Sequence, residues 1–258
     1  MLWHVSKTNL YLLGSIHVLD TPPPVSAETE RAYSLAERVV FEARLDEMPD
    51  VASGFFSDGD SLSHTIPAPL FAAAKRWWLA LGYPDAELER IRPWFAALRL
   101  MMGLLERHGF IGEHGVDKHF WHRAVADRRA ISHLEATSSS LAPFAASPAS
   151  EQQQFLSMIA EQTDMLASEF AIMIRGWREH QTTPILDVLN RRLRLIPCMF
   201  TQLVPERNQR WMPRLLELAR DGIPTLAVLG VTHLVGPHGV PALFHEYDYD
   251  VLQIDRVA

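Results

Sequence analysis

The chain has 258 residues, of which 48% are hydrophobic and 21% are charged, and its formal net charge is −7. This composition is typical of a globular protein and excludes a disordered chain, which lacks the apolar residues needed for a core. The acidic balance, with no dominant stripe of Lys and Arg, excludes a generic nucleic-acid-binding protein.

The chain carries no segment typical of secretion or membrane insertion. The residues after Met1 lack a basic stretch that leads into a long apolar one, so a signal peptide is not expected. No run of about 18 apolar residues occurs, so no helix is expected to span a membrane. We therefore expect a cytoplasmic protein, with a leader trimmed from the natural product as the alternative.

The single cysteine, Cys198, excludes a disulfide within the chain and a cysteine-based zinc site. Its neighbours in the sequence are apolar, so we expect a buried residue that contributes only packing.

The N-terminal part predicts a strand, a loop, a helix and a second strand. Residues 10–16 form a short apolar run that ends in turn-like residues, as a buried strand does. Three consecutive prolines, Pro22 to Pro24, predict a loop. Ser26 offers a helix start, and the helix is expected to continue through Ala36. Residues 38–42 then predict a strand that ends in the carboxylate of Glu42.

The middle of the chain, about residues 60–200, predicts mainly helices. Apolar residues recur at three- and four-residue spacing. Asp117 is expected to be the N-cap of one helix. A short strand is also expected within this part, at 130–135. The predicted helices cover 69–81, 84–108, 118–127 and 150–177.

After Pro205 the alternation of strands and helices resumes. We expect a helix at 206–220, a strand at 225–229, a loop and helix within 236–247 and a last strand at 250–254. The two ends share the order strand, Gly-x-x-His, loop, helix, strand, which suggests a weak internal duplication. The sequence thus predicts a single α/β (α+β) domain over 1–258. Segments 1–58 and 205–258 would form a small mixed sheet with its helices, around a large helical insert.

The two Gly-x-x-His motifs are Gly14-Ser-Ile-His17 and Gly230-Val-Thr-His233. Each follows a predicted strand, and ligands bind α/β sheets at the carboxyl ends of strands. We expect both glycines to allow a sharp turn or a close approach of the backbone. His17, His233 and Glu42 are therefore expected to share one site.

Two imidazoles and a carboxylate suit a divalent ion such as Zn, Mn, Fe or Co. A bound ion would make water acidic enough to attack a carbonyl group, with Glu42 as a ligand or as the general base. The alternative is that each histidine only forms hydrogen bonds at a strand end.

Other motifs offer weaker candidates. A second metal site is conceivable among His108, His114, His119 and His122. The tryptophans of the insert indicate helix packing, or else a substrate groove. The chain lacks His-Glu-x-x-His, Gly-x-Ser-x-Gly and a P-loop, which argues against a helix-borne zinc protease, a serine hydrolase and a P-loop nucleotide-binding protein.

Five blocks in order resemble the TraB/GumN family, which is related to the Tiki metalloproteases and more distantly to the erythromycin esterase/ChaN group. The blocks cover nearly the whole chain. They are Leu12-Leu-Gly-Ser-Ile-His-Val18, Val39-Val-Phe-Glu42, Gly115-Val-Asp-Lys-His-Phe120 with His133-Leu-Glu-Ala-Thr137, Glu206-Arg-Asn208, and Leu229-Gly-Val-Thr-His-Leu-Val-Gly236.

The resemblance implies a metal-dependent hydrolase, most simply a peptidase that uses Mn or Co, with Zn as a further option. It assigns His17, His233 and Glu42 to the metal and to catalysis. It places Arg207 and Asn208 near the site, where they would bind substrate or orient the ligands. Further site candidates are Glu135, Glu206, Gly14 and Gly230.

The expected partner is a peptide or a small-molecule substrate, and neither a nucleic acid nor a membrane span is expected. A protein that binds a peptide or small ligand without catalysis is the main alternative. Esterase activity is a weaker one, suggested by the distant relatives. The oligomeric state is left open.

Overall fold

Six strands form one mixed sheet in the order β4-β3-β5-β2-β1-β6 in a computed structural model that describes residues 1–57 and 59–255. Position 58 and positions 256–258, where the two predicted core segments end, lie outside the described residues. The predicted α/β class is confirmed. The strands are β1 (Leu2–Val5), β2 (Leu10–Ser15), β3 (Arg38–Phe41), β4 (Ala130–His133), β5 (Thr225–Gly230) and β6 (Val251–Gln253).

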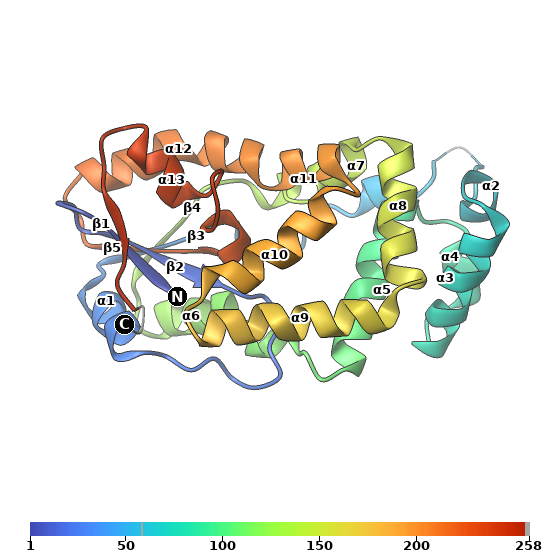
Figure 1. The fold of residues 1–258 in the computed structure, drawn as a ribbon, viewed down its shortest axis with the longest axis horizontal. Coiled ribbons are helices and arrows are strands. Elements are labelled where there is room, and N and C mark those ends of the chain that lie inside the picture. Colours follow the sequence, from blue (N-terminus) through green and yellow to red (C-terminus); the bar gives the residue numbers. More distant parts are fainter. Residues whose placement is uncertain (58, 256–258) are drawn as a thin grey trace.

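Helices cover both faces of the sheet (Figure 1). Two of them, α12 (Pro205–Arg220) and α13 (Val240–His245), lie above the sheet in this view. Two others, α1 (Ala27–Leu35) and α6 (Val116–Ala126), lie below it. Ser26 is the N-cap of α1, as predicted, because its hydroxyl accepts a hydrogen bond from the N–H of Thr29 at 3.1 Å.

The remaining helices extend the molecule away from the sheet (Figure 1). Most of them pack around a second hydrophobic cluster, in which Trp78 and Trp94 are fully buried, so these two tryptophans serve helix packing. The helices are α2 (Leu62–Thr65), α3 (Ala68–Ala80), α4 (Asp85–Leu88), α5 (Pro93–Arg107), α7 (Ala142–Ala146), α8 (Ala149–Ala160), α9 (Thr163–Arg178), α10 (Thr182–Leu193) and α11 (Pro197–Leu203). The exceptions to this packing are α10 and the C-terminal end of α9, whose Ile185, Ile174 and Trp177 belong to the core of the sheet.

The register of the sheet places the two Gly-x-x-His motifs side by side. The adjacent strands β2 and β5 are parallel, with Gly14 beside Leu229 and Ser15 beside Gly230. Strand β3 pairs in parallel with β5 on its other side, and β4 pairs in parallel with β3. Four neighbouring parallel strands therefore end at one edge, which is where ligands bind in sheets of this kind.

The sheet differs from the predicted one in two ways. Strand β1 was not predicted, and it joins the sheet by antiparallel pairing with both β2 and β6. Strand β4 was predicted, but it comes from the middle of the chain and lies beside β3. The sheet is therefore not built from segments 1–58 and 205–258 alone.

Several predicted local features are wrong. The predicted helix 150–177 is two helices, α8 and α9, and 84–108 contains α4 and α5. Gly115, not Asp117, is the N-cap of α6, and Asp117 lies in the first turn. Cys198 is exposed, because its neighbours Ile196 and Met199 turn inward instead.

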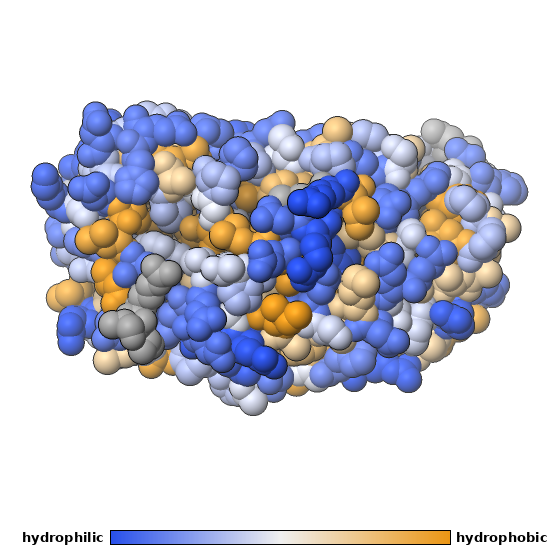
Figure 2. Space-filling model, viewed as in Figure 1, coloured by the Kyte–Doolittle hydropathy of each residue, from blue (hydrophilic) through white to orange (hydrophobic). Residues whose placement is uncertain are grey.

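Among the described residues, no helix combines the length and the apolar character that a membrane crossing requires. Figure 2 shows hydrophilic and hydrophobic residues interspersed on the face that it presents.

Candidate functional site

Four ionisable side chains gather at the carboxyl ends of four parallel strands. His17 follows β2, Glu42 follows β3, Glu135 follows β4 and His233 follows β5. Arg207, near the start of α12, makes direct contacts with Glu42, Glu135 and His233. The sheet thus brings together residues from opposite ends of the sequence.

Two neighbouring cavities open at this edge. The smaller, of about 260 Å³, is lined by His17, Glu42, Arg207, Gly230 and His233 among others. The larger, of about 470 Å³, also contains His17, Glu42 and Arg207 and extends to apolar side chains of α5 and α7. The predicted cluster therefore faces space that a ligand can enter.

The guanidinium of Arg207 lies at the centre of the cluster. Its Nη2 donates to Glu42 Oε2 at 2.9 Å and to Glu135 Oε1 at 2.7 Å. Its Nη1 lies 3.4 Å from His233 Nε2. Burial lowers the pKa of Arg207, but the two carboxylates outweigh it and the net pKa is raised. Arg207 is therefore a permanent positive charge between two carboxylates.

His233 is held in one orientation by Asn208. The Nδ1 of His233 lies 2.7 Å from Asn208 Oδ1. The amide nitrogen of Asn208 donates to the carbonyl oxygens of His233 and His238, so its oxygen must be the acceptor for His233. The proton is therefore on Nδ1. Burial is the main cause that lowers the pKa of His233 to about 4, so near neutral pH its Nε2 is unprotonated and faces the N–H of Arg207 as an acceptor.

The surroundings of Asn208 bear on the two roles expected of it. Its side chain is fully buried, and both its oxygen and its nitrogen already form hydrogen bonds within the protein. Of the two expected roles, the structure supports the orientation of His233.

His17 is paired with Asp117, a residue whose site role the sequence did not indicate. The Nδ1 of His17 lies 2.9 Å from Asp117 Oδ2, and the ring remains two-thirds exposed (66%). The charge of Asp117 is the main cause that raises the pKa of His17 to about 9. A carboxylate on Nδ1 directs Nε2 away from Asp117, as in many metal-binding histidines. A metal ligand must be deprotonated, so His17 would exchange its Nε2 proton for an ion.

Glu42 is ionised in this setting. Burial raises its pKa, but His233, Arg207, His17 and the N–H of Gly230 outweigh burial and lower the pKa to about 2. The Gly230 N–H donates to Glu42 Oε1 at 2.6 Å. A Cβ on Gly230 would lie 3.1 Å from the same oxygen, so this glycine provides room for the carboxylate.

Neither motif glycine is in the positive-φ conformation that favours glycine. The φ of Gly230 is −52°, and Gly14 is not among the described glycines with positive φ. A Cβ on Gly14 would meet Trp3 and Val231 at 3.2 Å, so Gly14 serves packing within the sheet.

Glu206 lies outside the cluster. It is half-exposed, its carboxylate lies 3.8 Å from Arg210 and it lines a neighbouring cavity without His17, Glu42 or His233.

The donor types at the strand ends fit a divalent ion. Two imidazoles have Nδ1 occupied and Nε2 directed elsewhere, and a carboxylate beside them is ionised. Yet over residues 1–57 and 59–255 no three His, Cys, Asp or Glu groups are arranged to hold one ion. The same finding applies to the second predicted metal site, formed by His108, His114, His119 and His122. At the strand ends, the guanidinium of Arg207 contacts both Glu42 and His233.

Comparison with family models matches residues 1–253 to the TraB/PrgY/gumN family. The chain belongs to this family. The match spans both Gly-x-x-His motifs, Glu42, Asp117 and Arg207, so the whole cluster lies within the residues that match the TraB/PrgY/gumN family. The resemblance carried by the five sequence blocks is confirmed. No curated protein and no solved structure matches the chain.

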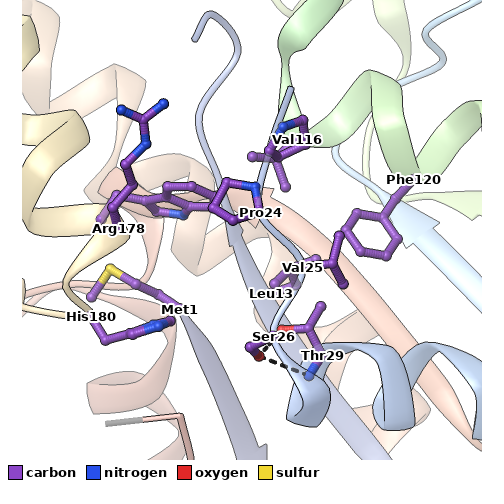
Figure 3. A pocket seen from close by; sticks show the side chains of 12 residues that line it. Met1, Leu13, Pro24, Val25, Ser26, Thr29, Val116, Phe120, Arg178 and His180 are labelled. Atoms are coloured by element: carbon purple, nitrogen blue, oxygen red, sulfur yellow. Dashed lines mark hydrogen bonds between the residues drawn. The ribbon is translucent and has the colours of Figure 1, made fainter. Parts of the chain in front are cut away.

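A separate cavity of about 150 Å³ is formed partly by α1, α6 and α9 (Figure 3). Leu13, Val116 and Phe120 line it, and it shares no residue with the two cavities at the cluster. It is therefore no part of the candidate site of this TraB/PrgY/gumN protein.

Gly115 supports the pair of His17 and Asp117 by leaving room for both. A Cβ at Gly115 would lie 2.5 Å from the carbonyl oxygen of His17 and 2.9 Å from Asp117 Oδ1. Gly115→Ala is therefore expected to lower the free energy of unfolding by about 1–3 kcal/mol, as overpacking does. Urea denaturation measures this loss. Gly112→Ala is the matched control, because a Cβ there meets nothing within 4 Å. Equal stability of the two variants would contradict the prediction.

Proposed function

We propose that the protein is a metal-dependent hydrolase that acts on peptides, with a divalent ion held by His17, His233 and Glu42. The observation that carries the proposal is the arrangement of the two histidines. Each has Nδ1 fixed by an acceptor from a helix, and each lines the same cavity as Glu42. An imidazole whose Nδ1 is anchored by an acceptor is the usual form of a metal ligand, and His17 would give up its Nε2 proton on binding the ion.

The surrounding residues have separate tasks in this proposal. Asp117 and Asn208 keep His17 and His233 in the orientation that directs Nε2 toward the ion. Glu42, ionised near neutral pH, can accept a proton from water. The positive charge of Arg207 can stabilise negative charge that develops on a carbonyl oxygen. A bound divalent ion would supply a Lewis acid and increase the acidity of water.

The choice of a peptide substrate and of Mn or Co rests on the family resemblance, and Zn also suits two imidazoles and a carboxylate. The larger cavity supports a substrate of more than a few atoms. It combines the charged groups at the strand ends with apolar side chains such as Leu98, Met101 and Phe144.

The test is metal analysis of protein purified without chelator, followed by assays on a panel of peptides and a panel of esters. We expect a retained Mn, Co or Zn ion and peptide cleavage that a chelator abolishes and the same ion restores. Saturable peptide binding without cleavage, whatever divalent ion is added, would instead support the non-catalytic binding protein. Cleavage confined to esters would support the esterase.

A further inference from the structure

The position of Arg207 has a consequence for metal binding. Its guanidinium donates to Glu42 Oε2, while the other oxygen of Glu42 accepts the N–H of Gly230. It also contacts the unprotonated Nε2 of His233, with Nη1 at 3.4 Å. Two of the three proposed ligands are therefore already in contact with a cation that belongs to the protein.

A divalent ion and the guanidinium of Arg207 compete for the position beside Glu42 and His233. The side chains of Arg207 and Glu42 are only 11% and 15% exposed, so water screens their charges weakly. A divalent ion bound to Glu42 and His233 would lie next to the guanidinium in its present position. Repulsion between the two cations opposes that arrangement, and metal binding therefore requires the guanidinium to move.

Glu135 already binds the guanidinium from the side away from Glu42. It accepts hydrogen bonds from Nη2 of Arg207 at 2.7 Å and from Nε at 3.3 Å. Its carboxylate is fixed in turn by the indole N–H of Trp211 at 3.2 Å. The Trp211 ring lies 4.8 Å from the guanidinium carbon. Arg207 can thus release Glu42 and still keep a carboxylate and an aromatic face as partners.

We infer that Arg207 is the resident cation of the site and that a divalent ion binds by displacing its guanidinium from Glu42 and His233, while Glu135 keeps hold of it. This inference rests on the proposed metal site. Arg207 then stabilises the two buried carboxylates when no ion is bound, and it sets the metal affinity through competition.

Two substitutions have opposite expected effects. Arg207→Gln removes the competing charge, so Mn²⁺ should bind about tenfold more tightly, a typical size for coupling between two ligands. Glu135→Gln removes the carboxylate that would retain the displaced guanidinium, so Mn²⁺ should bind about tenfold more weakly. If Arg207 and Glu135 only maintained the structure of the site, both substitutions would weaken Mn²⁺ binding, so changes in affinity of opposite sign would exclude a purely structural role.

The experiment is calorimetric titration of each full-length protein with MnCl₂, after dialysis against a chelator and then against chelator-free buffer. Arg210→Gln is the matched control, since Arg210 lies on the same helix, is exposed and has only a weak contact with Glu206. Thermal unfolding with and without Mn²⁺ provides a second readout. Apo Arg207→Gln should melt below the wild type, because Glu42 and Glu135 lose their partner, and Mn²⁺ should raise its melting temperature more than that of the wild type.

Arg207→Lys provides the same test if the glutamine variant does not fold. It keeps a charge but loses the planar fork that contacts both carboxylates, so its Mn²⁺ affinity should lie between those of the wild type and Arg207→Gln. Wild-type Mn²⁺ binding that is unchanged or weakened by Arg207→Gln and Arg207→Lys would overturn the inference and leave the proposed function intact. Binding by neither wild type nor variants would overturn both. Binding by Arg207→Gln alone would support the inference in its strongest form.

Discussion

Replacing His233 by Ala is expected to lower kcat/KM for peptide cleavage by about 10³-fold, within the range for loss of a catalytic group. The substitution removes a proposed metal donor whose Nδ1 is fixed by Asn208 and whose ring packs on Trp211 at a centroid distance of 4.5 Å. His17→Ala is expected to act in the same way, because Asp117 holds its Nδ1. Metal content and peptide cleavage should fall together in both variants.

His122→Ala is the control for these two substitutions. His122 is also a histidine with an acidic neighbour, but its ring is exposed and lies 3.9 Å from Glu113, away from the strand ends. We expect wild-type metal content and activity from it. The double variant of His17 and His233 is the decisive measurement, since unchanged metal content there would remove the basis of the proposed metal site.

Glu42→Gln is expected to lower the free energy of unfolding at pH 7 by about 3 kcal/mol, which is the linkage value for a carboxyl pKa lowered from 4.5 to about 2. The carboxylate of Glu42 binds a proton at higher pH in the unfolded chain than in the folded protein. The stabilisation by Glu42 is therefore complete above about pH 4.5 and is lost as the pH falls toward 2. The activity should fall by about 10²–10⁴-fold, because the variant lacks the proposed base.

Urea denaturation from pH 7 to pH 2.5 measures this effect. The wild type should lose stability steeply below about pH 4.5, and Glu42→Gln should lose less over the same interval because it has no carboxylate to protonate. Glu206→Gln is the matched control, since Glu206 is half-exposed and lies outside the cluster. The same pH dependence in Glu42→Gln and the wild type would mean that Glu42 does not contribute this stability.

Much of the site follows from local sequence patterns. A buried strand is recognised by a short apolar run, and the residue after it is known to lie at the sheet edge. Local patterns alone therefore predict that His17, Glu42 and His233 lie at strand ends. The parallel pairing of β2 with β5, and of β3 with β5, then brings these ends together.

Other parts of the site depend on contacts between distant segments. Asp117 lies 100 residues from its partner His17, and the sequence around it indicates only a helix start. Asn208 was expected near the site, but its orientation depends on the carbonyl oxygens of His233 and His238. No local pattern contains such pairings, because they arise when helices pack on the sheet.

The amino-acid sequence by itself determined the strands that carry the two motifs, most of the helices and the residue types at the strand ends, since these follow from the spacing of apolar residues and from turn chemistry. Only the tertiary structure decided that β1 and β4 join the sheet, and that the guanidinium of Arg207 bridges Glu42 and Glu135. Strand pairing and buried ion pairs depend on which surfaces meet in space, and residues separated by 72 and 165 positions meet here through Arg207.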